Sequence, residues 1–256
     1  MTSGVSPDLP HLDDLEPTKE LGLRLFRVPV RLLLQTWWRV QVHGRAHVPE
    51  SGPVILAANH IGVLDGPVLV AVTRRLTFAM AKHELFTGLS GRLLTYVGQI
   101  PVTRRAPDLL AIDRAVQVLR AGKVLAVFPE GRRTGGEVSY ARGGAAYLAM
   151  VTGAPVVPVA ILGTREPGQS RSQLPRRGAR LHVVYGEPFS VPASPWPRRQ
   201  DQVAHWNEEV RRRLADHVVA AQALTGLPLP GPPKPRELPL QPARRRMRRL
   251  SRAGRP

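Results

Sequence analysis

Short and almost wholly apolar runs recur between residues 40 and 190, and they restrict the chain to few fold classes. Such runs are typical of strands that are buried on both faces of a sheet. We predict strands over residues 53–58, 76–81, 123–128, 155–162 and 180–185. Amphipathic runs suited to helices occupy residues 67–74, 84–97, 107–121, 143–152 and 199–224. This alternation predicts an α/β fold in which helices flank a mixed, mostly parallel sheet. Pro158 predicts that its own strand is bulged or lies at an edge.

Composition limits the size of the core and removes several kinds of chemistry. The 256 residues, of which 43% are hydrophobic, are enough for one ordinary core and exclude wholesale disorder. The chain contains no cysteine. Disulfides, thiolate metal sites, iron–sulfur clusters and a cysteine nucleophile are therefore excluded.

An excess of basic residues indicates an anionic partner. Lysine and arginine number 37 against 19 acidic residues, which gives a formal net charge of +18. Nucleic acid, an anionic membrane surface and phosphorylated small molecules all fit this charge. We do not expect nucleic acid, because the sequence lacks interleaved aromatic residues and any recognised nucleic-acid-binding motif.

The C-terminal residues hold a large share of the charge. Residues 234–256 contain nine basic residues and one acidic residue, and residues 227–242 contain seven prolines. Proline can neither continue a helix nor donate to a sheet. We predict a disordered basic tail over residues 226–256, which is either merely solvated or attracted to anionic lipid headgroups.

Two segments precede the predicted sheet. Residues 1–20 are polar and lack the pattern of a secretion signal, so we expect a flexible N-terminus on a chain that stays in the cytoplasm. Residues 21–42 form an amphipathic helical segment, although Pro29 should start or kink a helix. We predict two kinds of anchor for a membrane interface, arginines on one helical face and a tryptophan pair: Arg24, Arg27, Arg31, Trp37 and Trp38. An ordinary helix that covers the core has the same pattern. No run of 18 uncharged apolar residues is present.

A histidine and an aspartate follow the first predicted strand. The segment NHIGVLDGP places His60 five residues before Asp65. Five residues turn about 500° around a helix, so these side chains cannot share a helical face and must meet across a turn. A carboxylate placed there can accept the proton of one imidazole nitrogen and leave the other nitrogen free to act as a base. A surface pair or a helix cap uses the same residue types.

Cations follow two other predicted strands. Residues 98–105 form an apolar turn or short strand that ends in Arg104 and Arg105, and an arginine there has the geometry to hold a phosphate. The strand over residues 123–128 is followed by Glu130, Gly131, Arg132 and Arg133. Sites of open α/β sheets lie beyond the carboxyl ends of strands, so these residues are candidates for binding.

Four short segments, taken in order, form a set of motifs. The first consists of Asn59, His60 and Asp65, and the second of Gly98, Ile100, Pro101, Val102 and Arg104. The third consists of Phe128, Pro129, Glu130, Gly131 and Arg133, and the fourth of Val157, Pro158, Val159, Ala160 and Ile161. This order resembles the glycerophospholipid acyltransferase family, of the bacterial 1-acylglycerol-3-phosphate acyltransferase type, over roughly residues 40–190. Arg132 stands where that family usually has threonine, and Thr134 where it usually has serine.

The resemblance implies an O-acyltransferase. Its substrates would be a thioester, either acyl-CoA or acyl carrier protein, and the free hydroxyl of lysophosphatidic acid, which would become phosphatidic acid. His60 is implied as the general base, and Asp65 as the residue that holds its tautomer. The implied residues around the acceptor phosphate are Arg104, Glu130, Gly131 and Arg133, with Arg132 and Lys82 as further candidates. The resemblance implies no metal and no cofactor.

Several alternatives stay open. The arginine at position 132 leaves room for another acceptor: glycerol 3-phosphate, a lyso-ornithine lipid or a glycolipid. Backbone amides near residues 101–103 or at the start of the helix after Asp65 could stabilise the oxyanion. A catalytically silent lipid-binding relative would be expected to lack His60 or Asp65. We expect an acyltransferase domain over residues 43–225, held as a peripheral or monotopic protein at the cytoplasmic face of the membrane.

Overall fold

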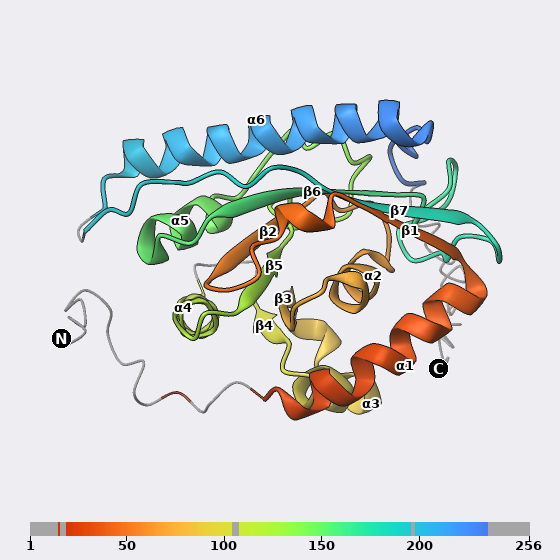
Figure 1. The fold of residues 1–256 in the computed structure, drawn as a ribbon, viewed down its shortest axis with the longest axis horizontal. Coiled ribbons are helices and arrows are strands. Elements are labelled where there is room, and N and C mark those ends of the chain that lie inside the picture. Colours follow the sequence, from red (N-terminus) through yellow and green to blue (C-terminus); the bar gives the residue numbers. More distant parts are fainter. Residues whose placement is uncertain (1–14, 16–18, 104–107, 196–197, 235–256) are drawn as a thin grey trace, which may run out of the picture.

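The computed structural model describes residue 15 and residues 19–103, 108–195 and 198–234 (Figure 1). Most of the predicted N-terminal segment, Arg104 and most of the predicted basic tail lie outside these residues. The strands are β1 Arg39–His43, β2 Val54–Ala58, β3 Thr77–Lys82, β4 Ile100–Val102, β5 Val124–Val127, β6 Val156–Leu162 and β7 Arg180–Tyr185. The helices are α1 Leu21–Trp37, α2 Asp65–Val72, α3 Gly88–Tyr96, α4 Leu109–Arg120, α5 Gly144–Thr152 and α6 Gln200–Thr225, with short 3-10 turns at Arg45–His47 and His83–Leu85.

The seven strands form one sheet in the order β1-β7-β6-β2-β5-β3-β4. Neighbouring strands are parallel except for β6 and β7, which are antiparallel. The predicted mixed, mostly parallel sheet is therefore confirmed. The carboxyl ends of β2, β5 and β6 come together at one edge, and the loops that follow these three strands carry the candidate site.

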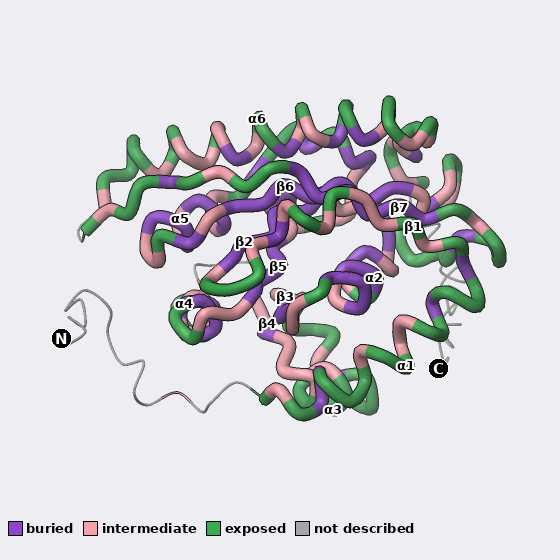
Figure 2. Tube along the Cα trace, viewed as in Figure 1, coloured by how far each residue is buried: buried purple, intermediate pink, exposed green. Residues whose placement is uncertain are grey.

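Helices cover the sheet on both faces (Figure 1). Ile55 and Ala57 of β2 pack with residues of α4 and α5, whereas Leu56 and Ala58 pack with residues of α1 and α2. Successive side chains of a strand point to opposite faces, so a strand covered on both faces needs an uninterrupted apolar run. Figure 2 shows this buried interior between exposed outer helix faces.

The end of the predicted helical segment 21–42 is wrong, because α1 stops at Trp37 and β1 follows. Val40 and Val42 alternate with polar residues, and β1 pairs with β7 from Arg39 opposite Arg180 to His43 opposite Val184. A strand remote in sequence thus supplies the partner that the local pattern does not reveal. Pro29 lies inside α1 rather than at its start.

The predicted helix over residues 84–97 is also shorter than expected. A 3-10 turn at His83–Leu85 comes first, and the extended backbone of Thr87, with φ −117° and ψ 150°, separates that turn from α3. Extended dihedrals break the run of helical hydrogen bonds. Helix α3 is therefore a separate element from the turn before it.

Pro158 does not mark an edge strand, because β6 lies between β2 and β7. Proline lacks an N–H group, so a central position would normally lose a ladder bond. The ladder between β6 and β7 starts at Val159, which pairs with Tyr185. Pro158 therefore lies opposite Gly186, the residue that follows β7. Gly186 donates its N–H to the carbonyl of Pro158 at 2.8 Å, so this pair keeps the one hydrogen bond that a proline can form there.

Candidate active site

The loop after β2 brings His60 and Asp65 together. The Nδ1 atom of His60 lies 2.7 Å from Oδ2 of Asp65, which confirms that the side chains meet across a turn. Gly62 makes this turn possible, because a Cβ there would lie 2.5 Å from the carbonyl oxygen of Thr164. The imidazole also packs on the Phe128 ring, with centroids 4.4 Å apart.

Asp65 is fully buried, and hydrogen-bond donors surround its carboxylate. Oδ2 accepts the backbone N–H groups of Ile61 at 2.7 Å and Gly62 at 2.9 Å, and Oδ1 accepts the hydroxyl of Thr164. Oδ2 also accepts from Nδ1 of His60, because a carboxylate oxygen has no proton to donate. The proton of neutral His60 is therefore on Nδ1, and the lone pair is on Nε2.

Glu130 ties the loop after β5 to the loop after β2. It is buried, its Oε1 accepts the backbone N–H of His60 at 2.9 Å, and its Oε2 accepts the hydroxyl of Thr134. The N–H of Thr134 donates in turn to the carbonyl of His60 at 2.8 Å. Burial raises the pKa of the Glu130 carboxyl above its ordinary value. Each carboxylate oxygen of Glu130 therefore accepts a hydrogen bond from a protein group.

Arg165, which no sequence pattern singled out, holds the loops after β2 and β5 together. It is 2% exposed, and its guanidinium donates to four carbonyl groups at 2.6–3.3 Å, those of Ile61, Thr134, Gln169 and Gly231. A buried charge needs such partners to be tolerated. The only signal in the sequence is its place just after β6, which is also where Thr164 supplies the hydroxyl bond to Asp65.

A cavity of about 510 Å³ opens beside His60 and extends toward α1 and α3. Its walls are mostly apolar, and they include Phe26, Val70, Met80, Leu94 and Phe128. Polar groups in the lining are few and mainly cationic: His60, Arg27, Lys82, Gln99, Arg133 and Arg142. The cavity therefore suits a molecule that joins an apolar chain to a negatively charged group.

The remaining predicted site residues fall into three groups. Gly131, Arg133 and Lys82 line the cavity; Lys82 pairs with Glu84 at 2.8 Å, and Arg133 donates to the carbonyl of Arg171 at 3.0 Å. Arg132 is exposed and is not part of the cavity lining among the described residues. Arg104 lies outside the described residues.

The predicted membrane anchors of α1 differ from one another in their surroundings. Arg27 is turned inward, where it donates to the carbonyl of Thr73, and burial lowers its pKa. Trp38 is buried and donates Nε1–H to Pro175 at 3.1 Å, whereas Trp37 is exposed. The expectation of one arginine face and a tryptophan pair at the surface is therefore wrong for Arg27 and Trp38. Among the described residues, no helix has both the length and the apolarity needed to cross a bilayer.

A histidine oriented by a buried carboxylate, beside an apolar cavity with cations in its wall, is suited to proton transfer on amphiphilic, anionic substrates. That arrangement, on this mostly parallel sheet, defines a class of lipid-modifying α/β enzyme. Residues 39–162 match the family profile described as Acyltransferase, so this part of the chain is an acyltransferase domain.

Known proteins similar to the chain agree with this family. The 1-acyl-sn-glycerol-3-phosphate acyltransferase of Bacillus subtilis is 26% identical over 189 residues, which are 73% of this chain and 92% of that protein. A protein of the same name from Borreliella burgdorferi is 31% identical over 131 residues, 49% of this chain and 52% of that protein, so the match spans about half its length. The crystal structure of the 1-acyl-sn-glycerophosphate acyltransferase PlsC from Thermotoga maritima has a TM-score of 0.55 at 24% identity, covers 77% of this chain and 78% of that chain, and shows a common fold.

Proposed function

We propose that the protein transfers a fatty acyl group from acyl-CoA or acyl carrier protein to the free hydroxyl of lysophosphatidic acid, with phosphatidic acid as the product. One observation carries the proposal: the imidazole of His60, held by Asp65, lines an apolar cavity that also contains cationic side chains. The names of the Bacillus and Borreliella relatives support this acceptor.

The reaction follows from the proton positions in the site. Nε2 of His60 takes the proton of the acceptor hydroxyl, while the oxygen attacks the thioester carbonyl. A new C–O bond forms, the C–S bond breaks, and the departing thiolate receives the proton. Asp65 stabilises the transient imidazolium. The Thr103 amide already donates to Asp108 at 2.7 Å, which favours backbone amides at the start of α2 as oxyanion donors.

We assign the acceptor phosphate to the cations of the cavity wall. Arg133 approaches the cavity from the loop after β5 and Lys82 from the last position of β3, and Arg142 joins them from the segment before α5. Arginine can hold a phosphate through two parallel hydrogen bonds. Glu130 is assigned a positioning role, because its carboxylate holds the backbone of His60.

The proposed location is the cytoplasmic face of the membrane, with the protein bound peripherally or monotopically. Figure 2 shows much of α1 as exposed. The large apolar side chains exposed on this helix include Leu21, Leu25, Val28 and Leu32. These four residues follow each other at helical spacing and form one stripe. An apolar stripe on a helix that does not cross the bilayer is suited to lie within its interface.

An acceptor panel tests the function. Radiolabelled acyl-CoA and membrane vesicles are offered with lysophosphatidic acid, glycerol 3-phosphate, a lyso-ornithine lipid or a lyso-glycolipid. We expect lysophosphatidic acid to give the highest kcat/KM. A higher value with another acceptor would replace the proposed substrate while leaving acyl transfer in place, and the absence of any acylated product would contradict the proposed reaction.

Arg133→Ala is expected to raise the KM for lysophosphatidic acid about 10- to 100-fold with little change in kcat. The change removes a charged hydrogen-bond donor that contacts the phosphate equally in the bound acceptor and in the transition state. The KM is measured at saturating acyl-CoA. The neighbouring Arg132→Ala is the matched control, since Arg132 is exposed outside the cavity lining. Equal effects of the two changes would contradict a specific phosphate contact of Arg133.

A further inference from the structure

Helices α1 and α3 lie side by side at the surface of the molecule (Figure 1). The rings of Phe26 and Tyr96 meet edge to face, with centroids 5.9 Å apart. Gly22 allows this close approach, because a Cβ there would lie 2.1 Å from the carbonyl oxygen of Tyr96. The two helices therefore form one continuous surface.

Helix α3 carries two adjacent faces of different chemistry. Leu89, which is 83% exposed, forms an apolar outer face with Leu93 and Tyr96. Gly88, Gly91, Arg92 and Thr95 follow at helical spacing and form the neighbouring face. An apolar face next to a cationic face is the pattern of a helix at a membrane surface, where cations lie at the level of the headgroups.

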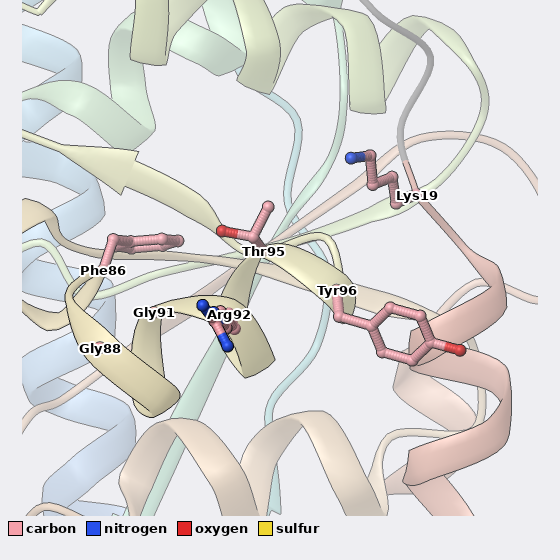
Figure 3. Close-up of a pocket in the computed structure, with 7 residues that line it drawn as sticks. All are labelled: Lys19, Phe86, Gly88, Gly91, Arg92, Thr95 and Tyr96. Carbon is pink, nitrogen blue, oxygen red and sulfur yellow. The ribbon is translucent and has the colours of Figure 1, made fainter.

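The second face lines a hollow that is separate from the cavity beside His60. We call it the α3 hollow; it has a volume of about 600 Å³, opens to solvent, and is lined by Lys19, Phe86, Gly88, Gly91, Arg92, Thr95 and Tyr96 (Figure 3). Figure 3 shows Phe86 and Tyr96 on opposite sides of Arg92 and Thr95. Lys19 reaches the hollow from the chain just before α1.

The charge of the α3 hollow is wholly positive. Its lining contains an ammonium group, a guanidinium group and a hydroxyl group, but no carboxylate. Within the part of the chain that the structure describes, neither Lys19 nor Arg92 has an ion-pair partner. Gly88 adds no side chain to the space, and a Cβ there would meet nothing within 4 Å. Cations on both sides of an open hollow, with a hydroxyl between them, suit a phosphate group.

We propose that the α3 hollow binds the phosphate headgroup of an anionic phospholipid of the membrane, as a site distinct from the acyl-transfer site. The adjoining apolar face favours a lipid over a soluble phosphate compound, because the strongly exposed Leu89 lies one helical turn before Arg92 on α3. The site would set the orientation of α1 and α3 on the bilayer. The inference rests on the proposed membrane location, but not on the chemistry of acyl transfer.

Vesicle sedimentation of the full chain tests the site. Vesicles of phosphatidylcholine alone are compared with vesicles that also contain phosphatidylglycerol, for the wild type and for the double variant Lys19→Gln, Arg92→Gln. We expect the partition coefficient of the variant onto anionic vesicles to fall on the order of tenfold or more, because each basic residue near an anionic surface contributes appreciably to binding. Its binding to neutral vesicles and its thermal melt should be unchanged.

The matched control removes the same charge elsewhere. Arg120 at the end of α4 and Arg212 on α6 are exposed, and both helices cover the face of the sheet opposite α1 and α2. Arg120→Gln, Arg212→Gln should leave partition within about twofold of the wild type, because surface charges remote from the bilayer are screened. An equal loss in this control, or no loss in the first variant, would overturn the α3 hollow as a site.

Two further arms separate the rival explanations. Inorganic phosphate and coenzyme A are titrated into the wild type and the Lys19→Gln, Arg92→Gln variant without vesicles, and equal binding is expected. Tighter binding by the wild type would assign the hollow to a soluble phosphate compound and overturn the lipid assignment. If the wild type binds neither kind of vesicle, the proposed membrane location and this site are both overturned. If the wild type transfers no acyl group in detergent, only the proposed reaction is contradicted.

Discussion

His60→Ala is expected to lower kcat about 10³-fold with the fold intact. The imidazole is the group assigned to take the hydroxyl proton, and a positioned general base contributes about 10²- to 10⁴-fold to such reactions. Its side chain is 18% exposed and, within the described part of the chain, makes one hydrogen bond, to Asp65, so its loss should cost little stability. Transfer of labelled acyl groups under saturating substrates measures kcat, and a thermal melt verifies folding.

A second histidine provides the control for this change. His205 lies on α6 and is exposed, with its ring against Trp206, so His205→Ala should leave kcat within about twofold of the wild type. A well-folded His60→Ala protein with full activity would remove His60 from the role of base. Loss of activity accompanied by an unfolded protein would be resolved with His60→Gln, which retains a polar side chain of similar length.

Asp65→Asn is expected to lower kcat about 10³- to 10⁴-fold, through charge rather than through shape. The amide can direct its oxygen toward His60, Ile61 and Gly62 and its NH₂ toward Thr164, whose hydroxyl can then accept. The fold should therefore survive, with the free energy of unfolding lowered by about 1–3 kcal/mol, because the hydrogen bonds to this buried group become weaker. The imidazolium formed during proton transfer would lose its negative partner.

Thr164→Val separates these contributions. It removes the hydroxyl bond to Oδ1 of Asp65 but leaves the carboxylate charge and the contact with His60 in place. We expect a fall in kcat below about tenfold, together with a small loss of stability measured by urea unfolding. A Thr164→Val protein as inactive as Asp65→Asn would show that hydrogen-bond geometry, and not the charge of Asp65, governs the reaction.

Much of the fold follows from local patterns. The apolar runs predict β2, β3, β5, β6 and β7 within one or two residues, because a strand covered on both faces admits few polar side chains. β1 escapes prediction, since its alternating Val40 and Val42 resemble the end of an amphipathic segment until β7 is beside them. Edges and central positions depend on strand order, which the pattern of one strand does not contain.

The candidate site shows the same division. The spacing of His60 and Asp65 already requires a turn, and the structure places the two side chains 2.7 Å apart. The sequence does not reveal that Glu130 holds the backbone of His60, nor that Arg165 holds the loops after β2 and β5 together. These contacts join residues about 70 to 104 positions apart, and burial decides which polar groups must find each other there.

Sequence alone therefore determined the alternation of strands and helices, the family resemblance and the pairing of His60 with Asp65, because periodicity and short spacings are local properties. Tertiary structure decided the central place of Pro158, the burial of Trp38 and the inward turn of Arg27. Each of these depends on which distant segment lies opposite. The free energy of a side chain is set by that neighbour and by access to water, and neither is written in the residues beside it.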